Sequence, residues 1–244
     1  MTETDRLEPL PDDNVRRVLC VVAHPDDMEY GTSAAVAHWT RKGVEVAYLL
    51  LTSGEAGMQR PPSEAGPLRA DEQRAACEVV GVRDLTILDY PDGVLEPTLE
   101  LRRDIARVIR RFKPDAVVTV SWDIEVPWGL NQADHRVAGL ATVDAVAAAG
   151  NAWIFPEVAE DEGLPPWGAT WLLVSGTAQP THAVEVTDED VAASVASLES
   201  HRAYLADLPD HPAPADFIPD MLHSAGPRLG AAAAVPLRAH RLRN

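Results

Sequence analysis

Cysteines are scarce in this sequence, which has only Cys20 and Cys77 among 244 residues. Each lies in a segment with the pattern of a buried strand or helix, so we expect two buried thiols. A disulfide framework needs more cysteines, and a reducing compartment, the cytoplasm, is the expected location. The acidic and polar residues 1–16 do not resemble a signal peptide.

Basic residues are also few, since 21 Lys and Arg stand against 38 Asp and Glu, giving a formal net charge of −17. This charge argues against non-specific binding to nucleic acids and to anionic membrane surfaces. No apolar run approaches the ~18 residues of a membrane-spanning helix. No G-x-G-x-x-G motif follows the first expected strand, which argues against a dinucleotide cofactor. We therefore expect neither nucleic-acid nor membrane partners.

The sequence does contain a regular alternation of strand and helix patterns. Apolar runs predict buried strands, and amphipathic segments predict the helices between them. The expected strands are 18–23, 44–52, 84–89, 116–120, 171–175 and 183–186, and the expected helices are 32–42, 68–80, 99–112, 134–149 and 188–204. Short units of this kind predict an α/β fold with a Rossmann-like, mainly parallel sheet and helices on both faces.

The ends of the chain have weaker patterns. We expect one domain over residues 1–244, with a loose lead-in over 1–15. The proline-containing residues 58–67 are expected to form a loop. Five prolines also occur over 208–228. The C-terminal extension 208–244 is therefore open to three interpretations, as a lid, an oligomer arm or an ordered coil.

Polar clusters follow three of the expected strands, at residues 24–29, 53–57 and 131–135. The carboxyl ends of parallel strands meet at one edge of a sheet, where ligands collect. The first cluster is part of AHPDDME over 23–29 and brings one imidazole and three carboxylates together. Like charges this close repel unless a cation or a reaction compensates. The cluster therefore indicates half of a metal site, with an acidic helix cap as the alternative.

His24 and Asp27 are three positions apart, so a helical turn would place both on one face, where they can bind one ion. Asp26 would then point elsewhere. Catalytic zinc usually has three protein ligands and an open position, and His135 is the best candidate for the third. Asp134 beside it could orient the site. A His/Asp/His set suits Zn²⁺, with Fe²⁺ as an alternative.

The motif AHPDDME resembles the AHPDDxE signature of the LmbE-like, or PIG-L, N-acetylglucosaminyl deacetylase family. A second family block, similar to His-Pro-Asp-His-Arg, corresponds to Gln132–Arg136. Weaker family features match in the same order, namely TSGEAG over 52–57, Arg69 before Glu72, and YPDG over 90–93. The resemblance covers residues 16–150 well and the C-terminal third loosely.

Members of this family are zinc-dependent hydrolases that remove an acyl group, usually acetyl, from an amine on a sugar. The resemblance implies that Asp26 is the general base and that Arg69 and Asp92 hold sugar hydroxyls. It implies the same metal ligands as the spacing argument: His24, Asp27 and His135.

Gln132 departs from the family pattern, because it replaces the first histidine of the second block, which supports the oxyanion in the family. A glutamine amide can donate a hydrogen bond, but it carries no positive charge and cannot donate a proton. The oxyanion role of Gln132 is therefore open, and the replacement can mark a different substrate.

Other residues near the motifs have simpler interpretations. Glu29 is expected to be a buried structural acid rather than a further ligand. Glu55 is expected to be a local turn residue or a group that supports the site from behind, rather than a catalytic residue. Trp122 and Trp128 can line a pocket or pack in the core. The remaining histidines are expected to be surface or core residues: His38, His182, His201, His211, His223 and His240.

The sequence thus predicts a cytoplasmic, zinc-dependent N-acyl hydrolase that acts on a small-molecule amino-sugar conjugate, and it leaves open a homo-oligomer. One alternative is an amidase or deacetylase of a thiol conjugate or a glycosylated natural product. An alternative of another class is a non-catalytic sugar- or nucleotide-binding module on the same fold. That module is disfavoured, because a binder has no need of Asp26 as a spare base beside a metal.

Overall fold

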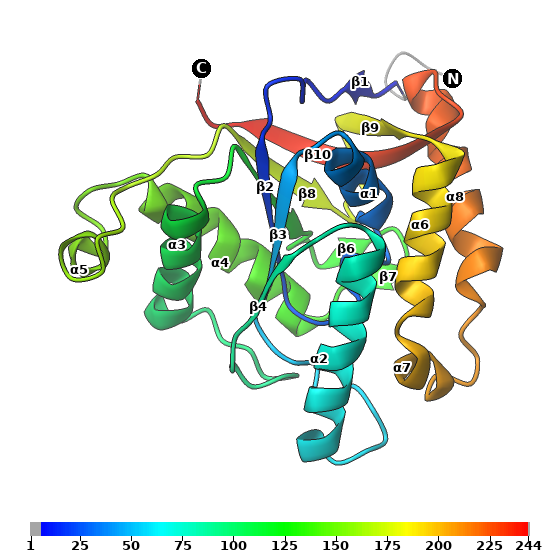
Figure 1. Cartoon of the computed structure of the whole chain (residues 1–244), viewed down its shortest axis with the longest axis horizontal. Coiled ribbons are helices and arrows are strands. Elements are labelled where there is room, and N and C mark those ends of the chain that lie inside the picture. Colours follow the sequence, from blue (N-terminus) through cyan, green and yellow to red (C-terminus); the bar gives the residue numbers. More distant parts are fainter. Residues whose placement is uncertain (1–5, 244) are drawn as a thin grey trace.

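The computed structural model describes residues 6–243 and confirms the predicted α/β architecture (Figure 1). The strands are β1 (Glu8–Pro9), β2 (Arg17–Val22), β3 (Glu45–Leu50), β4 (Asp84–Ile87), β5 (Ala116–Val120), β6 (Glu125–Val126), β7 (Gly129–Leu130), β8 (Trp171–Ser175), β9 (His182–Val186) and β10 (Ala233–Arg241). The helices are α1 (Ser33–Arg41), α2 (Pro62–Val79), α3 (Leu99–Phe112), α4 (Ala133–Ala149), α5 (Pro156–Glu160), α6 (Asp188–Glu199), α7 (Arg202–Ala206) and α8 (Pro214–Leu229).

Eight strands form one sheet in the order β1-β9-β10-β8-β5-β2-β3-β4, and β6 and β7 form a separate hairpin. The run from β8 to β4 is parallel throughout, whereas β10 is antiparallel to both of its neighbours. The sheet is therefore mainly parallel, as the alternating pattern predicts.

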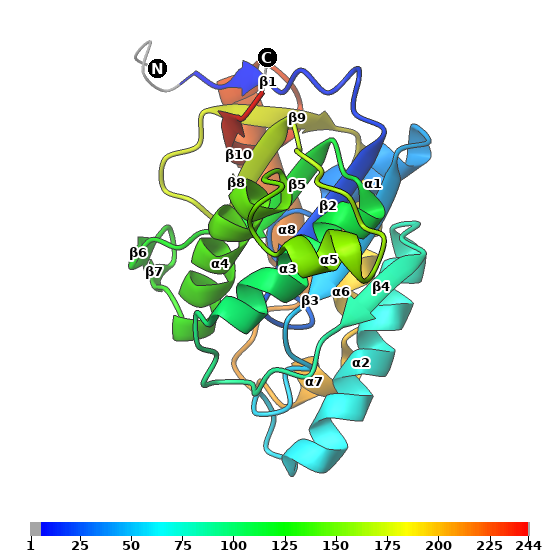
Figure 2. The ribbon, with the colours of Figure 1, turned by 90° about the vertical axis from the view of Figure 1, so that its left-hand side faces the viewer.

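The central strand β2 is buried on both faces. Val18, Cys20 and Val22 belong to one hydrophobic cluster, and Leu19 and Val21 belong to the other, because alternate side chains of a strand point to opposite faces. Helices α1, α2, α6 and α8 cover the first face, and α3 and α4 cover the second (Figures 1 and 2). Among residues 6–243, no helix combines the length and apolar character needed to cross a membrane.

The order of the strands places the polar clusters together. The chain runs from β2 outward to β3 and β4, and then returns to place β5 on the other side of β2. At such a switch point, a crevice opens outside the carboxyl ends of the strands. His24 follows β2. His135, which is 111 positions after His24 in the chain, follows β5. The fold therefore brings both motifs to one edge of the sheet.

Two proline-rich segments are more helical than the sequence analysis predicts. Helix α2 begins at Pro62, inside the expected loop 58–67, because proline is tolerated in a first helical turn, where its missing N–H has no intrahelical partner. Helix α8 occupies most of 208–228, although Pro219 and Pro227 lie within it. Its buried Ile218 and Leu222 pack in the first core cluster, so tertiary packing outweighs the cost of the prolines.

Three further differences from the predicted elements lie toward the ends of the chain. Strand β10, which the sequence analysis does not predict, inserts between β8 and β9. The expected helix 188–204 is two helices, because the chain turns at 200–201. Within the expected loose lead-in, β1 pairs with β9 and Leu7 and Leu10 are buried. Residues 1–5 of that lead-in lie outside the described residues.

Arg110 on α3 is fully buried and closes the end of α4. Its guanidinium donates hydrogen bonds at 2.8 to 3.2 Å to five backbone carbonyls, those of Ala148, Ala149, Asn151, Ile154 and Phe155. The last carbonyls of a helix have no intrahelical donor and carry partial negative charge. Arg110 satisfies these groups and also fixes the loop that follows the helix.

Replacing Arg110 with Met is expected to lower the free energy of unfolding by about 3 kcal/mol, because five backbone carbonyls, two of them in fully buried contacts, would lose their donor. Urea denaturation followed by circular dichroism measures this change. Arg111→Met on the same helix is the matched control, since Arg111 is exposed and its loss should cost less than about 0.5 kcal/mol. Equal stabilities of the two variants would contradict the capping role.

Candidate metal centre and active site

A cavity of about 690 Å³ lies at the carboxyl ends of the parallel strands. Residues that follow β2, β5 and β8 line it, together with residues from α2, α7 and α8. Its lining includes all the residues predicted to act as base, metal ligands or substrate contacts: His24, Asp26, Asp27, Arg69, Asp92, Gln132 and His135. The cavity therefore brings together the residues with predicted catalytic, metal-binding and substrate-binding roles.

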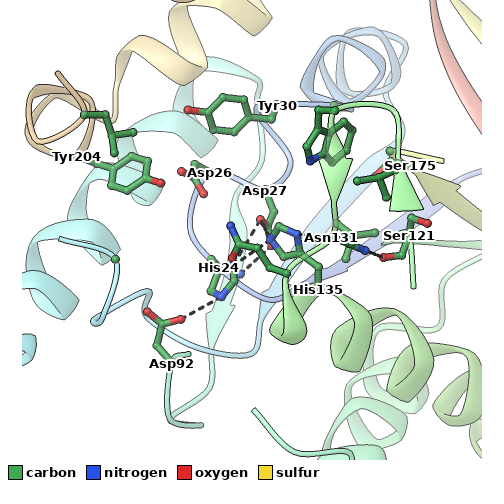
Figure 3. Close-up of a pocket in the computed structure, with 18 of the residues that line it drawn as sticks. His24, Asp26, Asp27, Tyr30, Asp92, Ser121, Asn131, His135, Ser175 and Tyr204 are labelled. Atoms are coloured by element: carbon green, nitrogen blue, oxygen red, sulfur yellow. Dashed lines mark hydrogen bonds and ion pairs between the residues drawn. The ribbon is translucent and has the colours of Figure 1, made fainter. Parts of the chain in front are cut away.

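The three predicted metal ligands point toward one another (Figure 3). His24 Nδ1 lies 3.2 Å from His135 Nε2, and Asp27 Oδ1 lies 2.9 Å from His135 Nε2 and 3.7 Å from His24 Nδ1. Ligand atoms at about 2.0–2.1 Å from a tetrahedral zinc are separated by about 3.3 Å. The spacing and the chemistry of this donor set therefore fit a zinc ion.

Groups behind the ligands set the orientation of both imidazoles. His24 Nε2 lies 3.0 Å from Asp92 Oδ1 and 3.4 Å from Asp134 Oδ2, which directs Nδ1 toward the other ligands. Asn131 Oδ1 lies 3.2 Å from His135 Nδ1 and leaves Nε2 for the metal. Metal-binding histidines commonly contact such oxygens through their second nitrogen. The contact of Asp134 with His24 is one that sequence adjacency alone could not establish.

The carboxylates control the charge of this cluster. Burial by itself lowers the pKa of His24, but Asp27, Asp134 and Asp92 raise that pKa well above its ordinary value. Burial by itself raises the pKa of Asp27, but His135 and His24 hold it far below its ordinary value. The cluster thus stabilises positive charge at its centre, which protons or a divalent cation can supply.

Asp26 is buried beside the predicted metal ligands and has an unusual backbone. Its φ of 85° lies in the left-handed region, and its N–H donates to Gln73 Oε1 at 2.9 Å. One carboxylate oxygen, Oδ1, lies 3.2 Å from Arg69 Nη2, and the other, Oδ2, is buried with no hydrogen-bond partner among the described residues. Burial raises the pKa of Asp26 to about 6, although Arg69 acts to lower it. Such a carboxyl is suited to proton transfer near neutral pH.

Arg69 and Asp92, for which the resemblance implies contacts to sugar hydroxyls, are both held by protein groups. Arg69 Nη1 donates to Gly54 O at 2.9 Å and Nη2 to Pro25 O at 2.7 Å. The carboxylate of Asp92 contacts His24 and accepts a hydrogen bond from the N–H of Ala56 at 2.8 Å. Both residues therefore position the site, and their substrate contacts stay predictions.

Gln132 occupies the N-cap position of α4 and is exposed at the cavity. Gln132 lies three residues before His135, so a substrate bound near His135 would also lie near Gln132. The structure holds no oxyanion, and the role of Gln132 stays a prediction.

Sequence reasoning missed several residues of the cavity. Tyr30, Tyr204 and His211 all line it, and the hydroxyl of Tyr30 lies 2.6 Å from His211 Nε2. The sequence analysis gives His211 no site role, whereas the structure places it in the lining of the cavity. Tyr30 follows the first motif directly, which is a usable signal. Tyr204 ends the expected helix 188–204, and His211 lies in the proline-containing extension. Neither is near a motif in the sequence, so only the tertiary structure places them at the cavity.

Four other residues near the motifs contact different parts of the protein, and they are Glu29, Glu55, Trp122 and Trp128. Glu29 is a buried structural acid as expected, and its Oε1 accepts hydrogen bonds from Gln73 Nε2 at 3.3 Å and Ser197 Oγ at 3.2 Å. Glu55 accepts hydrogen bonds from Ser53 Oγ at 2.9 Å and from the N–H of Asp92 at 2.8 Å, so it links its own turn to the loop after β4. Trp128 lines the cavity, whereas the ring of Trp122 stacks beside His240.

The chain matches the family model described as GlcNAc-PI de-N-acetylase, PIG-L, over residues 19–146. A diacetylchitobiose deacetylase from Thermococcus kodakarensis is 31% identical over 186 residues, which are 73% of this chain and 66% of that protein. A 1D-myo-inositol 2-acetamido-2-deoxy-alpha-D-glucopyranoside deacetylase from Kineococcus radiotolerans is 34% identical over 57% of this chain and 47% of that protein. The aligned segments thus cover between about half and two thirds of the length of these relatives.

Solved structures of two different enzymes share the fold. The N,N'-diacetylchitobiose deacetylase from Pyrococcus horikoshii has a TM-score of 0.82 at 24% identity, covering 95% of this chain and 86% of that one. A 4-carboxy-2-hydroxymuconate hydratase from Pseudomonas putida has a TM-score of 0.70 at 20% identity, covering 94% and 98%. Because one is a deacetylase and the other a hydratase, the fold alone does not decide the reaction.

The family assignment rests on the sequence match together with the motifs. The matched residues 19–146 contain the whole of the first motif and the whole of the second block, including His135. These are the segments that the fold brings to one cavity. This chain therefore belongs to the PIG-L, or LmbE-like, family of GlcNAc-PI de-N-acetylases.

Proposed function

We propose that this protein is a zinc-dependent hydrolase that removes an acyl group, expected to be acetyl, from the amine of an amino-sugar conjugate. The observation that carries the proposal is the placement of a free carboxylate oxygen of Asp26 beside a compact His/Asp/His donor set in one cavity. Family membership supports deacylation as the reaction. The related deacetylases named above also have acetylated amino sugars in their names.

His24, Asp27 and His135 would hold the metal. Two imidazole nitrogens and one carboxylate oxygen form a donor set that suits Zn²⁺, with Fe²⁺ as an alternative. When bound, zinc supplies Lewis-acid chemistry, which lowers the pKa of water and polarises an amide carbonyl.

The residues of the chain handle the proton. Asp26 would accept a proton from the attacking water and pass it to the amine nitrogen as the carbon–nitrogen bond of the amide breaks. The products are a carboxylic acid and a free amine. Arg69 holds Oδ1 of Asp26, so the unpartnered Oδ2 is the oxygen available for the proton. Gln73 holds the backbone of the same residue from the other side.

A non-catalytic binding module receives less support from this geometry. A binder would gain nothing from a buried carboxylate oxygen without a partner, since such a group carries a desolvation cost. Asp26 Oδ2 is such a group, and it lies among the cavity-lining residues. A catalytic role explains why the cost is tolerated.

We expect the protein, purified from zinc-supplemented medium, to contain about one zinc ion per chain, and His135→Ala to contain less than about 0.3, because three ligands are needed for tight binding. Elemental analysis by mass spectrometry measures this ratio. Asp26→Asn is the matched control and should keep its zinc, since Asp26 is not in the donor set. A wild-type protein that binds no zinc under these conditions would show that the metal assignment is wrong.

The Asp26→Asn variant should lose about 10²–10⁴-fold in kcat, because an amide cannot accept the proton from water. The measurement is release of free amine from a panel of N-acetylglucosamine conjugates, with zinc content checked in the same samples. Asp71→Asn on the exposed surface of α2 serves as the control. Wild-type turnover by Asp26→Asn would rule out this residue as the base.

Gln73→Met removes the acceptor that holds the left-handed backbone of Asp26. We expect kcat to fall about tenfold to a hundredfold with KM and zinc content nearly unchanged, because a small displacement of a base costs rate rather than binding. Gln59→Met, at an exposed position, is the control. A rise in KM at constant kcat would instead assign Gln73 to substrate binding.

A further inference from the structure

We propose that the conjugate has an apolar portion beyond its amino sugar, and that Trp128, Leu208 and Met221, here called the apolar wall, bind an aromatic or aliphatic aglycone. The proposal deepens and rests on the proposed function, since the acylated amine must reach the metal ligands of the same cavity. All three residues of the wall line that cavity.

Most polar side chains of the cavity already have partners within the protein. Arg69 contacts Asp26 and two backbone carbonyls, and Asp92 contacts His24 and a backbone N–H. Asn131 donates to the carbonyls of Ser121 and Asp123, at 2.7 and 3.0 Å, and its oxygen faces His135. A sugar hydroxyl that displaced any of these bonds would leave a polar protein group unpaired, at a cost of about 1–3 kcal/mol.

The apolar wall, by contrast, is open to contact. Trp128 is 68% exposed and Met221 is 38% exposed, although both line the cavity. A large aromatic ring that stays exposed inside a concave site gains free energy when a ligand covers it. Trp128 and Met221 come from the β6–β7 hairpin and from α8, so the wall joins segments far apart in the sequence.

The ring of Trp128 lies against the backbone of Gly176. Gly176 has a φ of 65°, and a side-chain carbon at this position would lie 2.7 Å from the Trp128 ring. The edge of the indole therefore contacts the chain just after β8, while most of the side chain stays exposed. An exposed tryptophan at the mouth of a cavity is the kind of side chain that serves as an aromatic anchor.

The apolar surface continues from Trp128 along the hairpin. Ile124 and Leu130 are 67% and 77% exposed, and Val126 lines the cavity. Figure 2 shows the hairpin standing out from the sheet beside α4. Exposed apolar residues beside a ligand-sized cavity are typical of a binding surface. Because Val126 and Trp128 themselves line the cavity that holds the donor set, the distal part of a substrate is favoured as the occupant over a second copy of the chain.

The experiment compares methyl, phenyl and octyl glycosides of N-acetylglucosamine, in both anomeric forms, with zinc-loaded enzyme. We expect kcat/KM to be at least about tenfold higher for the phenyl and octyl compounds than for the methyl compound, as burial of their apolar surface predicts. In Trp128→Ala, the ratio of phenyl to methyl should fall to about one. Trp153→Ala, which removes an exposed Trp outside the cavity, should keep the wild-type ratio.

Each remaining outcome decides between the two proposals. Equal kcat/KM for all glycosides overturns the apolar wall and leaves the deacylase proposal intact. If no glycoside is deacylated, the deacylase proposal fails for these compounds, and calorimetric binding of the phenyl and methyl glycosides then tests the wall by the same ratio. If light scattering shows that Trp128→Ala dissociates an oligomer, the patch is an interface between copies and the wall proposal is overturned.

Discussion

The charge balance around His24 is the interaction on which the rest of the site depends. One nitrogen of its ring faces His135 and Asp27, and the other faces Asp92 and Asp134. These partners come from the end of β2, the loop after β4 and the start of α4. The imidazole thus joins three segments and also limits each carboxylate to one orientation. A cation at the centre would stabilise the fold as well as serve the reaction, because metal binding is coupled to folding.

Helix α2 gives the second layer of this arrangement. Arg69, Glu72 and Gln73 are spaced so that they share one face of the helix, and each holds a different part of the cavity. Arg69 and Gln73 hold the side chain and the backbone of Asp26. Glu72 accepts hydrogen bonds from the backbone N–H groups of Ala203 and Tyr204, and so places Tyr204 above the Arg69 guanidinium. One helix therefore connects the first motif with the C-terminal third of the chain.

The comparison with a hydratase of the same fold shows why the side chains must carry the functional argument. The sheet supplies an edge where several loops meet, and the donor set and the free oxygen of Asp26 are the observations that support the proposed chemistry. Gln132 and the apolar wall both lie at the cavity but outside the His/Asp/His donor set. A substitution there would alter contacts with a substrate and leave the proposed metal ligands in place.

The sequence by itself determined the α/β class, the buried cysteines and the grouping of polar clusters at strand ends, because these follow from local periodicity and from short motifs. It also identified His24, Asp27 and His135 as residues that can share one ion, a grouping that the structure brings together. The tertiary structure alone decided that α8 is helical despite its prolines and that β10 enters the sheet. It also decided that Arg69 and Asp92 face protein groups and that Tyr204 and His211 line the cavity. These features depend on contacts between distant segments, whose free energy no local pattern records.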